Sequence, residues 1–142
     1  MDKLSAERRS ANMRQIRSQN TAPELLLRRM LHSAGYRFRL HRKDLPGKPD
    51  LVFPCRRKVI FVHGCFWHQH PGCREGRIPQ SRREYWESKL VRNQQRDAAA
   101  QVSLQEQGWR ALVIWECELK DTGAAMRTVQ RFLGKAGQFR LD

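Results

Sequence analysis

The chain has 142 residues, enough for one domain with a real core and too few for two independent ones. Its 28 lysines and arginines exceed 14 aspartates and glutamates, which gives a net charge of +14 and favours a polyanionic partner. No apolar run approaches the roughly 20 residues that span a bilayer, and no signal-peptide pattern opens the chain. We therefore expect an intracellular protein whose partner is a nucleic acid.

The first 20 residues are rich in arginine and poor in apolar side chains. They predict a basic arm, residues 1–20, that becomes ordered on a phosphate backbone. A single domain, residues 21–142, is expected to follow. Candidate contacts to that backbone are Arg14 and Arg17 in the arm, and Lys48 further along the chain.

A helix and three strands are predicted next. Thr21 to Glu24 form a capping box, and the leucines that follow predict an amphipathic helix. Residues 36–40 alternate between apolar side chains and arginine, as in a half-buried strand. Residues 51–53 and 58–62 are short runs of β-formers and predict the two strands of a hairpin.

The segment from Gly64 to Gln80 has no periodicity and holds three glycines, two prolines, two histidines and two cysteines. An ordered loop of this length usually needs a function or a clamp, and a metal ion would be such a clamp. In a reducing compartment cysteines are better candidates for metal ligands or small buried side chains than for disulfides. The chain has four of them: Cys55, Cys65, Cys73 and Cys117.

Two helices and one strand complete the domain. Ser81 to Glu84 form a second capping box, which predicts a long polar helix that runs to about Gln107. Residues 109–115 are apolar and predict a strand at the centre of the sheet, and a last helix is expected over residues 122–133. The predicted order is therefore α, β, β, β, α, β, α.

The predicted hairpin carries a candidate metal site. Asp50 begins one strand, and the polar position at the end of the next strand would be its neighbour in space. Mg²⁺ prefers carboxylate, carbonyl and water oxygens, and it can bridge a scissile phosphate and activate a water molecule. Pro49-Asp50 is also an ordinary turn dipeptide, so this signal alone does not decide between the two interpretations.

The element order, with Pro49-Asp50 entering the second strand, resembles the PD-(D/E)XK nuclease fold. That resemblance implies a restriction-endonuclease-like α/β core of three layers around a central mixed sheet. The acid-x-Lys half of that motif is missing, because the matching strand ends Phe61-Val62-His63.

Residues 61–68, Phe-Val-His-Gly-Cys-Phe-Trp-His, closely resemble the signature of the very short patch repair endonucleases, in which histidines replace that lysine. The resemblance covers nearly the whole chain. It extends through Asn12-Met13-Arg14, Thr21 to Glu24, Leu45 to Asp50, Tyr85-Trp86, Asn93, Arg96-Asp97, Gly108 to Arg110 and Trp115 to Cys117.

The family resemblance implies a strand-specific, Mg²⁺-dependent endonuclease that nicks duplex DNA beside a T:G mismatch left by deamination of 5-methylcytosine. Asp50 and the backbone carbonyl of Val62 would bind the metal, and His63 and His68 would handle the water and the phosphate. His68 suits a general base because imidazole titrates near neutral pH. Glu24 would orient His68 in addition to its role in the capping box.

A structural zinc site is also implied. His70, Cys73 and Cys117 are suitable zinc ligands by residue type. The resemblance adds Asp97 as the fourth ligand, although by itself Asp97 is an ordinary acid on a helix surface. Cys55 and Cys65 match no ligand of the family and are expected to be buried packing residues.

Large aromatic residues at a loop tip usually belong to a core. In a basic DNA enzyme they can instead insert between base steps, which costs less at a mismatch than at a matched pair. The resemblance implies this wedge role for Phe66, Trp67 and Trp86, whereas Trp109 and Trp115 are expected in the core.

The expected partner is therefore double-stranded DNA with a T:G mismatch, and mismatch-repair proteins and a repair polymerase are further candidates. We expect a monomer that works in the bacterial cytoplasm, at the nucleoid, without membrane contact. Two alternatives stay open. One is a restriction-like or homing-associated nuclease that nicks matched DNA, and the other is a zinc-stabilised DNA-binding protein without catalysis.

Overall fold

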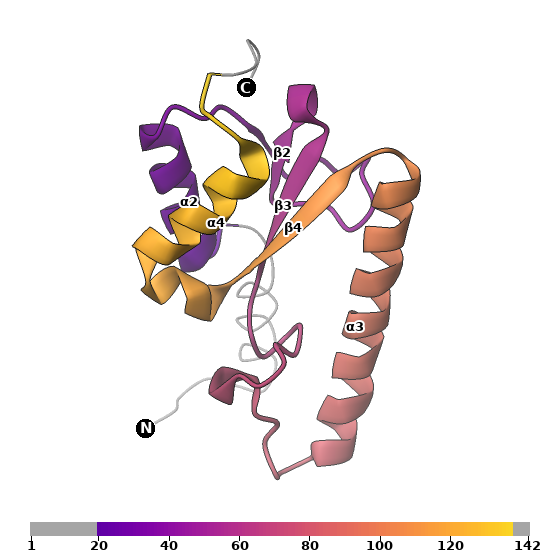
Figure 1. The fold of residues 1–142 in the computed structure, drawn as a ribbon. Coiled ribbons are helices and arrows are strands. Elements are labelled where there is room, and N and C mark those ends of the chain that lie inside the picture. Colours follow the sequence, from indigo (N-terminus) through magenta and orange to yellow (C-terminus); the bar gives the residue numbers. More distant parts are fainter. Residues whose placement is uncertain (1–19, 138–142) are drawn as a thin grey trace.

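The computed structural model describes residues 20–137. The predicted basic arm, with Arg14 and Arg17, lies outside the described residues except for Asn20. Within residues 20–137 the helices and strands follow one another as α2 (Ala22–Ser33), β1 (Arg39–Leu40), β2 (Leu51–Phe53), β3 (Lys58–His63), α3 (Arg83–Glu106), β4 (Arg110–Trp115) and α4 (Thr122–Leu133) (Figure 1).

The four strands form one mixed sheet in the order β1-β2-β3-β4. β1 pairs with β2 and β2 with β3 in antiparallel fashion, whereas β3 and β4 are parallel along their whole length, from Lys58 opposite Arg110 to His63 opposite Trp115. The predicted α/β class with a mixed sheet is therefore confirmed. The central position predicted for residues 109–115 is wrong, because among the described residues β4 pairs only with β3 and forms an edge of the sheet.

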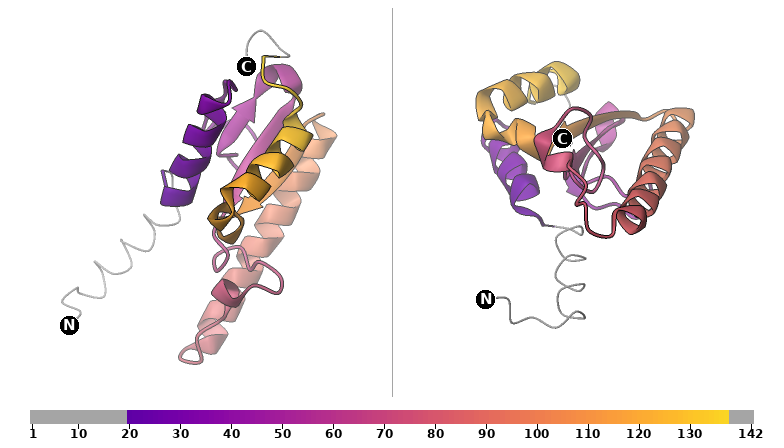
Figure 2. Two further views of the ribbon diagram at one scale, coloured as in Figure 1. Left: turned by 60° about the vertical axis from the view of Figure 1, so that its left-hand side comes forward. Right: turned by 90° about the horizontal axis from the view of Figure 1, so that it is seen from below.

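Helices cover both faces of this sheet. The edge strand β4 is apolar because helices pack on both of its faces. α2 and α4 lie on one face and α3 on the other (Figure 2). Successive residues of β2 and β3 point to opposite faces, so each strand contributes to both cores. One core contains Leu27, Leu31, Val129 and Leu133 with Leu51, Phe53, Ile60 and Ile114, and the other contains Leu104 with Val52, Val59 and Phe61.

The helix starts show where local sequence signals hold and where they fail. Thr21 caps α2 as predicted, because its hydroxyl accepts the backbone N–H of Glu24. The capping box predicted at Ser81 is wrong: α3 begins after Arg82, which has φ 57° and no side-chain capping bond. The observed N-cap, Arg82, thus lies one residue after the predicted cap, and the helix begins at Arg83.

The bounds of the other elements follow the sequence closely. β2 and α4 have the predicted bounds, and β3 extends the prediction by one residue, to His63. The first strand is shorter than predicted, since only Arg39 and Leu40 pair with β2. No helix within residues 20–137 has both the length and the apolar character required to cross a membrane.

Candidate active site

One cavity of about 1060 Å³ opens where β3 ends. The start of α2, the connection between β1 and β2, the end of β3 and the following loop all contribute to its walls. The residues predicted for metal binding and catalysis line it together: Glu24, Asp50, Val62, His63 and His68. Lys48 and Asp97 line it as well. We call Glu24, Asp50, His63, His68 and Asp97 the carboxylate–histidine cluster.

Asp50 lies directly before β2, beside the end of the antiparallel strand β3. The backbone N–H of Val62 donates to Asp50 Oδ2 at 2.7 Å and fixes the carboxylate there. Burial raises the pKa of Asp50, although the Val62 N–H and nearby basic side chains oppose this shift. A carboxylate that is desolvated in this way gains from the approach of a cation.

His63 and His68 form a stacked pair of imidazoles. Their ring centroids are 3.8 Å apart and the planes differ by 6°. Burial, together with the neighbouring His68, lowers the pKa of His63 to about 4, although Asp97 opposes the shift. His63 is therefore neutral near pH 7, and His68 is the imidazole of the pair that contacts an acid.

Asp97 lies in α3, and its Oδ2 is 2.6 Å from His68 Nδ1. This contact orients the ring and makes Nε2 the basic nitrogen of His68. The structure thus differs from two predictions. Asp97 is placed beside His68 and not with the cysteines, and Glu24 does not contact His68.

Glu24 instead belongs to a buried ion-pair network at the start of α2. Its side chain is only 1% exposed; it forms an ion pair with Arg28, and its Oε2 lies 2.8 Å from His41 Nε2. Asn20 accepts a hydrogen bond from Arg28 at 2.8 Å. Burial lowers the pKa of His41, and the positive charge of Arg28 lowers it further.

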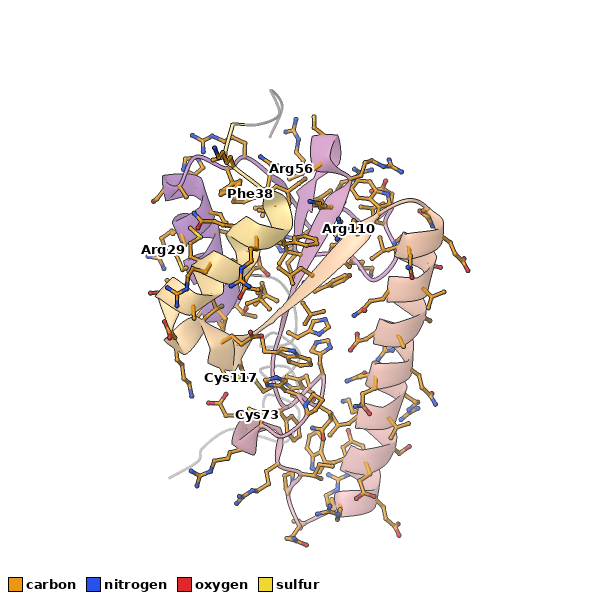
Figure 3. The ribbon with its side chains drawn as sticks, viewed as in Figure 1. Arg29, Phe38, Arg56, Cys73, Arg110 and Cys117 are labelled. Atoms are coloured by element: carbon orange, nitrogen blue, oxygen red, sulfur yellow. The ribbon has the colours of Figure 1, made fainter. Side chains whose placement is uncertain are left out.

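A second group of side chains that could hold a metal ion lies on the other side of the loop after β3. Cys65, His70, Cys73 and Cys117 place one ligand atom each within 4.8 Å of one another, and we call them the cysteine cluster. Figure 3 shows Cys73 and Cys117 side by side below the sheet. His70 Nδ1 lies 3.3 Å from Cys117 Sγ and 3.7 Å from Cys65 Sγ.

Cys65 is the fourth member of this cluster, and Asp97, which was predicted there, lies beside His68. The burial predicted for Cys65 is confirmed, and its thiol lies beside the other side chains of the cysteine cluster. The burial predicted for Cys55 is wrong, because Cys55 is exposed on the turn after β2.

Trp115 separates the two groups. Its ring stacks on His70, with centroids 4.3 Å apart, and meets His63 edge-on at 5.3 Å. Predicted as a core residue, it lies partly buried between the carboxylate–histidine cluster and the cysteine cluster. One indole ring thus contacts a histidine of each group.

The three residues predicted as a wedge contact one another, and two of them, Phe66 and Trp67, line the cavity. Phe66 lies 5.0 Å from Trp67 and 5.4 Å from Trp86, and the two indoles are 5.8 Å apart, all measured between ring centroids. Tyr85 is 5.1 Å from Trp86, so we include it with these three in the aromatic cluster. Asn93 of α3 donates to the carbonyl of Trp67 at 3.2 Å and ties the loop to the helix.

The amino-acid sequence matches known proteins along most of its length. Residues 1–74 match the family model described as DNA mismatch endonuclease Vsr. The DNA mismatch endonuclease Vsr of Escherichia coli (strain K12) is 46% identical over 112 residues, which cover 79% of this chain and 71% of that protein. The chain belongs to the Vsr family. The resemblance noted at residues 61–68 is thereby confirmed.

Other proteins similar to this chain are named as nicking enzymes. The type II nicking enzyme V.XorIIP of Xanthomonas oryzae pv. oryzae is 56% identical over 132 residues, 93% of this chain and 96% of that protein. The type II nicking enzyme V.NmeAIP of Neisseria meningitidis is 37% identical over 132 residues, 93% of this chain and 94% of that protein.

The sequence alone did not predict His41 and Arg28 as site residues of this Vsr chain, and it gave Cys65 no ligand role. For Cys65 and His41 the sequence does contain a signal. Cys65 begins the series Cys65, His70, Cys73 within nine residues, and His41 follows the strand that pairs with the one after Asp50. Arg28 carries no such signal, because an arginine one turn after Glu24 is an ordinary surface pair on a helix.

Proposed function

We propose that the protein is a metal-dependent endonuclease that cuts one strand of duplex DNA beside a T:G mismatch formed by deamination of 5-methylcytosine. One observation carries this proposal: a half-buried carboxylate, a neighbouring backbone carbonyl and an acid-oriented imidazole meet in one cavity with aromatic rings at its rim. The mixed sheet between two layers of helices is compatible with a restriction-endonuclease-like fold.

Mg²⁺ fits the oxygens on the β2–β3 side of the cavity. Asp50 and the carbonyl of Val62 would hold it, because both are hard oxygen donors. Burial disfavours the Asp50 carboxylate, and a bound cation would stabilise it. When bound, the ion supplies Lewis-acid stabilisation of the phosphate and lowers the pKa of a bound water.

The two histidines have different tasks in the proposed reaction. His68 acts as a general base, and its Nε2 accepts the proton of the attacking water. Asp97 sets the tautomer through its contact with His68 Nδ1. His63 is neutral, so it offers a hydrogen bond to a phosphate oxygen without adding charge to the buried site.

The cysteine cluster suits a structural zinc ion. Zn–S bonds of about 2.3 Å and Zn–N bonds of about 2.0–2.1 Å at a tetrahedral angle place sulfur and nitrogen about 3.5 Å apart. His70 Nδ1 lies 3.3 Å from Cys117 Sγ and 3.7 Å from Cys65 Sγ, which brackets that separation. Cys65, His70, Cys73 and Cys117 would hold the ion, and Asp97 would not.

The aromatic cluster provides a physical basis for mismatch selection. Inserting Phe66, Trp67 and Trp86 between base steps costs unstacking energy, and a T:G wobble resists this less than a matched pair. The basic arm and Lys48 would contribute phosphate contacts that do not depend on sequence. Acting as a monomer on chromosomal DNA, the enzyme would work in the bacterial cytoplasm, where repair proteins and a polymerase complete the repair.

The decisive experiment is a nicking assay with labelled duplexes that differ only at one base pair, with and without Mg²⁺. We expect Mg²⁺-dependent cleavage of the thymine strand at T:G and much slower cleavage of matched T:A and C:G duplexes. The names of the nicking-enzyme relatives favour a second candidate, sequence-specific nicking of matched DNA. Equal cleavage of matched and mismatched duplexes would select that candidate, and DNA binding without cleavage would remove both.

A further inference from the structure

A third histidine, His41, lies beside the carboxylates of the proposed metal site. Its side chain is 14% exposed, and its Nε2 is 2.8 Å from Glu24 Oε2. Its backbone N–H donates to the carbonyl of Asp50 at 3.3 Å, which ties this residue to the start of β2. With φ 49°, His41 has a left-handed backbone that persists only where the surrounding contacts enforce it.

Glu24, His41 and Asp50 together have the geometry of a metal site. One carboxylate oxygen from each acid and one ring nitrogen lie within 4.8 Å of one another. A divalent ion with bonds of about 2.2 Å joins donors up to about 4.4 Å apart, so shifts of a few tenths of an ångström bring all three donors into range.

Arg28 shows that this corner of the cavity already stabilises positive charge. Its guanidinium pairs with Glu24 and lies 3.2 Å from His41 Nε2, so the carboxylate and the ring face one cation together. A metal ion bound by Asp50 at the same wall would compete with Arg28 for both side chains.

We propose that Glu24 and His41 join Asp50 and the Val62 carbonyl as ligands of the catalytic metal, which makes the centre a mixed oxygen–nitrogen site that favours Mn²⁺ over Mg²⁺. This inference rests on the proposed function. Imidazole suits first-row transition metals, whereas Mg²⁺ prefers carboxylate, carbonyl and water oxygens. The selectivity would come from His41, since Glu24, Asp50 and the Val62 carbonyl are all oxygen donors.

The test measures Mn²⁺ binding to the zinc-loaded full chain without DNA. His41→Gln removes the imidazole but keeps a polar side chain toward Glu24, and His32→Gln is a matched control at the exposed end of α2. Pulsed EPR of bound Mn²⁺ should show imidazole nitrogen coupling in the wild type and in His32→Gln, and no coupling in His41→Gln. The affinity for Mn²⁺ should fall about ten-fold in His41→Gln and that for Mg²⁺ less than about three-fold.

Three outcomes would overturn the inference: no nitrogen coupling in the wild type, coupling that survives in His41→Gln, or an equal loss of affinity for the two ions. In each case the proposed function stands, and His41 acts only on Glu24. A wild type that binds Mn²⁺ no better than Asp50→Ala would remove the proposed metal site itself. If His41→Gln does not retain zinc and a cooperative thermal transition, His41→Asn is measured in its place, and the wild-type spectrum alone still decides whether nitrogen is a ligand.

Discussion

The carboxylate–histidine cluster and the cysteine cluster differ in donor chemistry and in shape, although both lie at the same end of the sheet. The first lines an open cavity with oxygens and imidazoles, and the second gathers three thiols and one imidazole around a single point. His63 and Cys65 are two residues apart in sequence and belong to different groups. Open sites of hard donors suit catalysis, whereas closed sites of soft donors suit a structural ion.

Replacement of Asp50 should separate the two groups most clearly. Asp50→Ala should lower the nicking rate by about 10³-fold or more, because the metal contributes several kcal/mol to the transition state. Affinity for DNA should stay within a few fold, since many Lys and Arg contacts to phosphate carry it. Single-turnover nicking and a fluorescence binding assay measure the two quantities. Near-normal turnover in this variant would contradict the proposed active site.

Removal of Cys65 should affect the other group. Cys65→Ser should reduce the zinc content well below one ion per chain and lower Tm by about 10 °C, because a structural zinc site contributes folding free energy. Cys73→Ser and Cys117→Ser should behave alike. The matched control is Cys55→Ser, at the one exposed cysteine of the chain. Zinc analysis and calorimetry decide, and the assignment fails if Cys65→Ser retains its zinc.

The pKa of His63 makes stability depend on pH. Burial lowers this pKa from 6.5 to about 4 in the folded protein. The unfolded chain therefore binds the proton first as pH falls, and stability present above pH 6.5 decreases between about 6.5 and about 4, by about 3 kcal/mol. Urea unfolding across this range measures the loss. His63→Gln should lack this part of the slope, and equal slopes in the two proteins would show that His63 is not the cause.

Replacement of Asp97 tests to which of the two groups this acid belongs. Asp97→Asn should lower the nicking rate about 100-fold, because it removes the acid that orients the base. It should leave the zinc content unchanged, since the structure places Asp97 outside the cysteine cluster. Loss of zinc with normal stacking of His63 and His68 would return Asp97 to the role predicted from sequence.

The aromatic residues are expected to give the smallest effect on rate. Trp67→Ala should lower nicking of a T:G duplex about ten-fold, which corresponds to the loss of one stacking contact. Its salt-sensitive binding to matched DNA should change less. Trp115→Ala should instead lower Tm and zinc retention, because Trp115 stacks on His70. The division between wedge and support is wrong if Trp67→Ala unfolds the protein while Trp115→Ala stays folded and inactive.

Local sequence patterns were sufficient for much of the fold and for one half of the site. The bounds of β2 and α4, the cap at Thr21 and the family could all be predicted, as could the placement of Asp50 beside the end of β3. Each of these rests on neighbours in the chain or on the pairing of adjacent strands. Hydrogen bonding and side-chain alternation act over such short separations.

Only the tertiary structure decided which side chains meet across the loop. Asp97 is 29 residues from its partner His68, and His70 is 47 residues from Cys117. By residue type alone, either the acid Asp97 or the thiol Cys65 could be the fourth member of the group around His70. The packing of α3 along one face of the sheet carries Asp97 to His68, and the parallel pairing of β3 with β4 carries Cys117 to the loop that holds Cys65. No local pattern encodes these distances, because they depend on how whole elements pack.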